Sequence, residues 1–221
     1  MATMLRGIGH FKMPKYLYRY LQHEEYAKAF VAGEIWLSTF DHIRNCDATR
    51  ADAHDGTSEY TAEWRGTGDP TSEAVIQRRL AQGGIRFKGG LAGHVVTANV
   101  MHSRHRSAYV LCTTSIGNNA KMRSQFGQFC VQIHEPGAFM VSLVAAIELV
   151  VPWQHYVAGA VQYEGRKFAN ADESPGALGF ASVPSLKHER EFRLIYQPEN
   201  QDDIKPIAVT VPAARSLCEL I

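Results

Sequence analysis

The spacing of apolar residues along the chain predicts short strands and helices from its first part onward. Aromatic and apolar residues fill 16–21, and apolar residues recur at helical spacing over 23–32. Gly33 follows at the place where helices often end in a left-handed conformation. We therefore expect a strand, a helix and a second short strand over 34–38.

The rest of the chain continues this mixture with few long helices. Apolar runs and alternation predict further strands at 93–101, 108–114, 128–134, 156–163, 189–196 and 206–211. Capped or apolar segments predict helices at 39–45, 71–82, 137–148 and after Pro212. The polar, glycine-bearing segments 46–70 and 164–182 are predicted to be long surface loops.

Many short strands with few intervening helices do not fit a doubly wound parallel sheet. The pattern favours an α+β fold with a mostly antiparallel sheet, or two packed sheets, and short helices. A chain of 221 residues is long enough to bury one sizeable core. We therefore expect a single domain over residues 1–221.

Net charge excludes a surface that attracts phosphate everywhere, because 23 Lys and Arg nearly balance 22 Asp and Glu. The distribution is uneven, however. Acidic residues dominate 41–63, and six basic residues stand against one acid over 72–107. The basic region 72–106 is either a solvated basic surface or a site for a nucleic-acid backbone or an acidic partner.

The first residues, the length of the apolar runs and the cysteine spacing favour a cytoplasmic protein without a membrane partner. The first residues lack the apolar core of a signal peptide, and no apolar run reaches the length of a membrane span. Four cysteines occur without a C-x-x-C pair, so reduced thiols are expected. No metal site is expected, because the histidines at 102 and 105 have arginine neighbours that repel cations.

The most concentrated charge on a predicted strand lies in 189–196. Side chains alternate along a strand, so Glu189, Glu191 and Arg193 are predicted to share one face. Two carboxylates beside an arginine can raise the pKa of one while the other stays ionised, although an exposed face of alternating charge has the same pattern. The other face is predicted to enter the core and consists of Phe192, Leu194 and Tyr196.

Two further features could contribute to a binding site. Arg19 lies within an aromatic strand, so it either faces outward or meets a carboxylate or a ligand phosphate. Thr113, Thr114 and Ser115, which we call the hydroxyl cluster, follow an apolar strand. Such hydroxyls can orient a ligand or a carboxylate, or they can serve in a turn or a helix cap.

Together these features resemble the Arg-Ser-Glu class of ADP-ribosyltransferases, in which an arginine, a hydroxyl cluster and an E-x-E motif occur in this order. This chain reads Thr-Thr-Ser where that class has Ser-Thr-Ser. A second resemblance covers most of the chain and is to a widespread bacterial and phage family of obscure function. The segments that carry it are 33–38, 111–114, 126–131 and 189–193.

The transferase resemblance implies a two-sheet fold with NAD bound in a cleft between the sheets. Arg19 would neutralise a phosphate of NAD, and the hydroxyl cluster would position the catalytic carboxylate. Glu191 would bind the 2′-hydroxyl of the nicotinamide ribose, and Glu189 would orient or deprotonate the acceptor. Either Phe126 or Tyr60 would stack on the nicotinamide ring.

The resemblance therefore implies an NAD-dependent mono-ADP-ribosyltransferase or an NAD glycohydrolase, acting in bacterial defence, as a toxin or in phage–host conflict. Its partners would be NAD, a protein or nucleic-acid acceptor and an antitoxin. The alternative is a non-catalytic binding module of the same fold, in which the basic region 72–106 holds nucleic acid or an acidic partner. Arg19, Ser115 and Glu191 should converge on a single cleft if the protein is the enzyme, and should not if it is the binding module.

Overall fold

The computed structural model describes residues 13–45, 55–67, 94–104, 107–165, 167–168, 178–200, 202 and 204–221. Its main sheet has eight strands, and each pair of neighbouring strands is antiparallel. The strands are β1 (Leu17–Leu21), β2 (Glu34–Thr39), β5 (Tyr109–Thr114), β6 (Phe129–Ile133), β7 (Trp153–Ala160), β9 (Glu191–Pro198), β10 (Ile207–Thr210) and β11 (Cys218–Leu220). Their order is β10-β2-β5-β1-β6-β11, with β9 between β5 and β7. The predicted α+β class with a mostly antiparallel sheet is confirmed.

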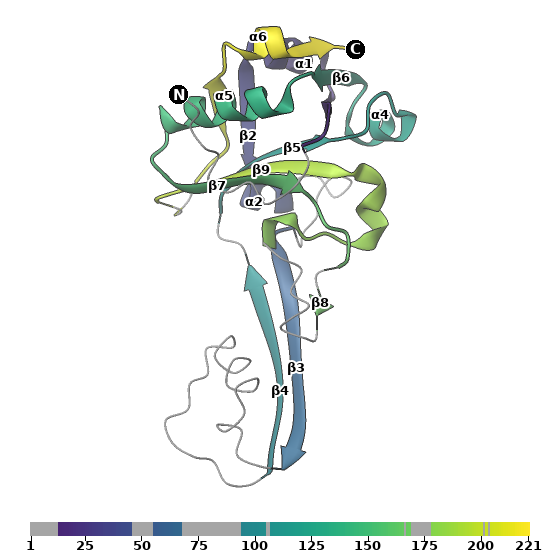
Figure 1. The fold of residues 1–221 in the computed structure, drawn as a ribbon, viewed down its shortest axis with the longest axis vertical. Coiled ribbons are helices and arrows are strands. Elements are labelled where there is room, and N and C mark those ends of the chain that lie inside the picture. The colour runs from purple at the N-terminus through teal and green to yellow at the C-terminus, as the bar shows by residue number, and fades with distance from the viewer. Residues whose placement is uncertain are drawn as a thin grey trace.

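A second sheet projects away from the first (Figure 1). It pairs β3 (Thr57–Thr67) with β4 (His94–Arg104) in an antiparallel hairpin, and β8 (Lys167–Phe168) joins β3 in parallel. The prediction of a loop over 46–70 is therefore wrong for 57–67, where threonines and aromatics favour a strand although acids interrupt them. Residues 46–54 and 68–70 lie outside the described part.

Five α-helices are described, and local caps explain several of their ends. They are α1 (Glu24–Ala32), α2 (Phe40–Arg44), α4 (Ala120–Phe126), α5 (Pro136–Glu148) and α6 (Ala214–Leu217). Gly33 ends α1 with φ +96°, and Thr39 Oγ1 accepts a hydrogen bond from the His42 amide at the start of α2. The predicted helix at 71–82 lies outside the described residues. None of the helices described is both long and apolar enough to cross a membrane.

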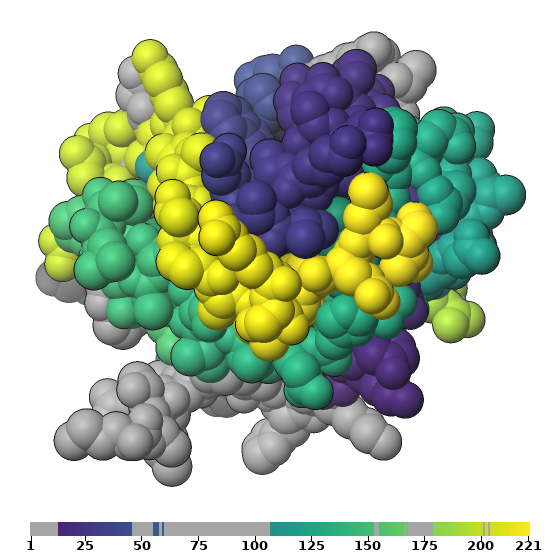
Figure 2. Space-filling model, turned by 90° about the horizontal axis from the view of Figure 1, so that it is seen from above, coloured from purple at the N-terminus to yellow at the C-terminus, as the bar shows by residue number. Residues whose placement is uncertain are grey.

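The main core lies between the sheet and the helices α1 and α5. The rings of Phe30 in α1 and Phe139 in α5 stack with their centres 5.7 Å apart. Figure 2 shows the C-terminal segment, in yellow, lying between the N-terminal segment and α5. The C-terminal segment therefore completes the main sheet, with β10 paired to β2 and β11 to β6.

Strand β9 divides its residues between two faces, as the alternation predicted. Phe192, Leu194 and Tyr196 are buried in the main core, which confirms that prediction. The strand begins at Glu191, however, and not at Glu189. Glu189 ends a 3-10 helix, η3 (Pro184–Glu189), and Arg190 turns the chain with φ +42°. Within the predicted loop 164–182, a second 3-10 helix, η2, spans Leu178–Phe180.

The main sheet splits beside β5, and this split creates the site. Strand β9 pairs along one edge of β5 from Tyr109 to Thr114. On the other edge, β2 pairs with Tyr109 and Val110, whereas β1 pairs with Thr114. Strands β1 and β2 share this edge and diverge from it, so a gap opens between them next to Cys112.

Candidate functional site

A cavity of about 420 Å³ is lined by the diverging strands β1 and β2 together with β5, β9 and neighbouring segments. Its volume lies within the range of small-molecule sites. The structure brings most of the sequence-predicted site residues together here. Those that line the cavity are Arg19, Thr113, Thr114, Phe126, Glu189 and Glu191.

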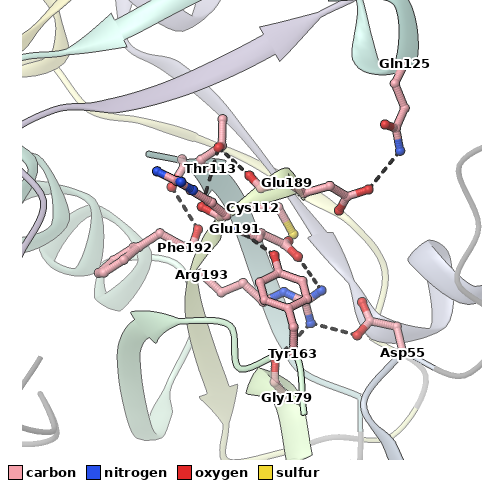
Figure 3. Close-up of polar contacts among 12 residues, drawn as sticks. Asp55, Cys112, Thr113, Gln125, Tyr163, Gly179, Glu189, Glu191, Phe192 and Arg193 are labelled. Atoms are coloured by element: carbon pink, nitrogen blue, oxygen red, sulfur yellow. Dashed lines mark hydrogen bonds and ion pairs between the residues drawn. The ribbon is translucent and has the colours of Figure 1, made fainter. Parts of the chain in front are cut away.

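Glu191 lies in a chain of buried ion pairs with Arg193 and Asp55 (Figure 3). Arg193 donates from Nη2 to Glu191 Oε2 over 2.7 Å, and from Nη1 to Asp55 Oδ1 over 2.7 Å. Its Nη1 also reaches the carbonyl oxygen of Gly179 at 2.9 Å. The predicted shared face is confirmed for Glu191 and Arg193 but is wrong for Glu189, which lies in η3 before the strand. One guanidinium neutralises part of the charge of two carboxylates.

These contacts set the charge state of Glu191. Burial raises the pKa of its carboxyl, but the charge and hydrogen bond of Arg193 outweigh that effect, with help from Cys112 and Arg19, and the pKa is lowered. Burial lowers the pKa of Arg193, but the charges of Glu191 and Asp55 outweigh this effect and raise that pKa. Near neutral pH, Glu191 therefore carries a negative charge inside the protein.

Glu189 is held separately, at the other side of the turn at Arg190. Its Oε1 accepts a hydrogen bond from Gln125 Nε2 at 2.8 Å, and Gln125 Oε1 lies 3.4 Å from His188 Nε2. Figure 3 shows Gln125 reaching the carboxylate of Glu189 from a different element than Arg193. The two carboxylates therefore have different partners and can serve different roles.

The hydroxyl cluster fixes the backbone on both sides of Glu191. Thr113 Oγ1 donates to the carbonyl oxygen of Phe192 at 2.8 Å, and Thr114 Oγ1 donates to that of Glu189. Ser115 is exposed and does not line the cavity, although its amide donates to the Arg190 carbonyl. The cluster therefore holds the backbone of the E-x-E segment in place by hydrogen bonds and does not contact the two carboxylates in these bonds.

Arg19 reaches into the split between the strands. Its Nη1 donates to the carbonyl oxygen of Cys112, which lies on β5 between the points where β2 and β1 pair. The sequence suggested a carboxylate, a ligand phosphate or an outward-facing position for Arg19. The partner in the structure is a backbone carbonyl, and the residue is half-buried. A guanidinium has five N–H groups, and among the described residues Arg19 uses one in this bond. Its charge is therefore available to an anion in the cavity.

The two candidate stacking residues have different outcomes. Phe126 ends α4, lines the cavity and packs beside the buried cluster of Tyr20, Met122 and Cys130. Gly127 follows with φ +135°, and a Cβ there would overlap the backbone of Leu21. The backbone of Tyr60 lies in β3, but its side chain is outside the described part. Its assignment stays a prediction.

Sequence reasoning missed several residues of the site. Asp55 precedes β3 in a segment that reads as an ion site or a turn, and nothing in the sequence pairs it with Arg193. The Glu191 amide donates to Tyr163 Oη at 2.8 Å, and burial raises the pKa of Tyr163. Gln125 lies in a helix that the sequence did not predict. Each of these contacts joins segments distant in sequence, so local patterns carry no signal for them.

The alternative role for the basic region 72–106 stays a prediction, because most of that region and the side chains of β4 lie outside what the structure describes. Within the described residues, no three His, Cys, Asp or Glu side chains form a group suited to a metal ion. Comparisons with protein-family models, with curated proteins and with solved structures find no match for this chain.

Proposed function

We propose that the protein cleaves NAD and transfers its ADP-ribose to water or to an acceptor. The observation that supports this most is the common cavity of Arg19, Glu189 and Glu191, which come from β1, η3 and β9. The resemblance to ADP-ribosyltransferases implied that Arg19, Ser115 and Glu191 meet in one cleft between two sheets. Arg19 and Glu191 line one cavity at the split of the main sheet, whereas Ser115 is exposed outside it.

Glu191 is suited to the bond-breaking step. Cleavage of the bond between ribose C1′ and the nicotinamide nitrogen sends both bonding electrons to nicotinamide, and positive charge develops on the ribose ring. A buried, ionised carboxylate stabilises that charge in the transition state. One Glu191 oxygen is bound by Arg193, and a carboxylate accepts about four hydrogen bonds, so a ribose 2′-hydroxyl has an acceptor here.

Glu189 is suited to the second step. A water molecule or an acceptor group adds to ribose C1′ and must lose a proton. Glu189 lines the same cavity and accepts a hydrogen bond from Gln125, and its carboxylate is suited to take that proton and pass it to solvent. With water the products are nicotinamide and ADP-ribose, and with another acceptor they are nicotinamide and the ADP-ribosylated acceptor.

Arg19 is suited to hold the diphosphate of NAD, because guanidinium groups bind phosphate oxygens in pairs. The cavity's charged lining includes three carboxylates, Asp55, Glu189 and Glu191, together with Arg193. Since Arg193 is bound to two of these carboxylates, Arg19 is the arginine left to attract an anionic ligand.

The proposal is tested by incubating the purified full chain with NAD and measuring free nicotinamide, with and without protein and nucleic-acid acceptors. Glu191→Gln keeps the side-chain shape but removes the charge, and we expect a loss of kcat of about 100-fold or more. Glu34→Gln is the matched control, since Glu34 is exposed on β2 and outside the cavity. It should leave the rate unchanged.

Two results would contradict the proposal. One is the absence of nicotinamide release under every acceptor condition. The other is a Glu191→Gln variant that is folded by circular dichroism and releases nicotinamide at the wild-type rate.

A further inference from the structure

Two large aromatic side chains stand exposed at the cavity. Tyr26 on α1 is 56% exposed and Trp36 on β2 is 55% exposed, and both line the cavity that holds Glu191. Large aromatic side chains bury much area when they are covered, so their exposure beside a cavity indicates a surface that a ligand covers.

The local structure holds both rings toward the cavity. On β2, Ile35 and Leu37 are buried in the main core, so alternation puts Trp36 on the opposite face with Ser38, which also lines the cavity. The Tyr26 ring is supported by His23, whose ring meets it edge-on at 5.1 Å. Both rings are already exposed, so they can contact a ligand without a rearrangement of the core.

The position of Trp36 differs from that of Glu191. Strands β2 and β9 pair with opposite edges of β5, which puts their axes about 10 Å apart where all three run together. Trp36 and Glu191 therefore approach the cavity from opposite edges of β5. Arg19 lies on β1, on the same side of β5 as β2, and supplies a positive charge to the same cavity.

We propose that Tyr26 and Trp36 form a second ring-binding subsite, which holds the adenine of the dinucleotide; this inference rests on the proposed function. A dinucleotide has two flat rings joined by an anionic diphosphate. The cavity offers two exposed aromatic rings, the guanidinium of Arg19 and the carboxylate of Glu191. Stacking needs no base-specific hydrogen bond, so the subsite accepts other purine nucleotides as well.

The test measures the binding of three probes by isothermal titration calorimetry: ADP-ribose, AMP and nicotinamide mononucleotide. Trp36→Ala is expected to weaken ADP-ribose and AMP binding about ten-fold or more, and Tyr26→Ala is expected to act in the same direction. Binding of nicotinamide mononucleotide should not change. Trp36→Phe, which keeps a flat ring, should retain most of the affinity.

Leu149→Ala is the matched control, because Leu149 is 87% exposed and does not line the cavity. It should bind all three probes as the wild type does. In turnover, Trp36→Ala should raise KM for NAD while kcat stays near the wild-type value, since stacking on adenine acts on substrate and transition state alike.

The outcomes separate this inference from the proposed function. Wild-type affinity for ADP-ribose in both alanine variants, or no binding of ADP-ribose and AMP to the wild type, would overturn the subsite even where nicotinamide release depends on Glu191. Conversely, ADP-ribose binding that depends on Trp36 without any nicotinamide release would overturn the proposed enzyme and support the subsite.

Discussion

Arg193 donates a hydrogen bond to Glu191 over 2.7 Å, and both side chains are almost fully enclosed. The same guanidinium binds Asp55, which comes directly before β3. The charge of Glu191 therefore depends on a contact that also links β9 to the start of the projecting sheet. Both the attachment of this segment and the ionisation of Glu191 therefore depend on Arg193.

Removal of Arg193 should destabilise the protein strongly. Arg193→Ala leaves two buried carboxylates without their main cation, and breaking a buried pair in this way costs about 3–5 kcal/mol. Urea unfolding at neutral pH measures the change in free energy of unfolding.

The control for this change is Lys28→Ala, which removes a surface pair with Glu24 in α1. Both of these side chains are more than half exposed, so the pair contributes about 0.5 kcal/mol or less. Equal losses in the two variants would show that the chain of ion pairs at Arg193 is not formed in solution.

Acid should destabilise the wild type more than the Glu191→Gln variant. The pKa of Glu191 is lower in the folded protein than its ordinary value of 4.5, so the unfolded chain binds the proton first as the pH falls. The stabilisation from Glu191 is therefore complete above pH 4.5 and is lost as the pH drops through the folded-state pKa. Urea unfolding at about pH 6 and about pH 3 measures how far the free energy of unfolding falls in the wild type and in the Glu191→Gln variant. An equal fall in both proteins would contradict the lowered pKa.

Two glycines should respond in opposite directions to alanine. Gly33 has φ +96°, and a Cβ there would overlap the carbonyl of Val211, so Gly33→Ala should destabilise by about 1–2 kcal/mol or more. Gly137 lies in the first turn of α5 with open space around it, and Gly137→Ala should stabilise by up to about 1 kcal/mol. Thermal unfolding of the two variants provides the comparison. An unchanged Tm for Gly33→Ala would contradict the close contact with Val211.

Much of the main sheet could be predicted because its strands and caps have local signals. The first strand, the helix that ends at Gly33, the strand after it and the alternation in β6 and β9 all follow from short-range patterns. Strand β3 was missed because acidic and other polar residues interrupt the aromatics in 57–67. Its order comes from pairing with β4, more than 25 residues away in sequence.

The site was predictable only in part. Motif order indicated Arg19, Glu189 and Glu191, and all three line the cavity. The partners that set their charge and orientation, Asp55 and Gln125, come from segments without a recognisable pattern. The split of the sheet beside β5 also has no local signal, because it depends on which strands share one edge.

The most direct test is a crystal structure of the Glu191→Gln variant soaked with NAD. The account predicts the nicotinamide ribose with its 2′-hydroxyl within hydrogen-bond distance of residue 191 and the diphosphate on Arg19. Calorimetry of the same variant with NAD confirms that the ligand binds in solution. NAD bound elsewhere on the protein, or an empty cavity at saturating NAD, would contradict the account.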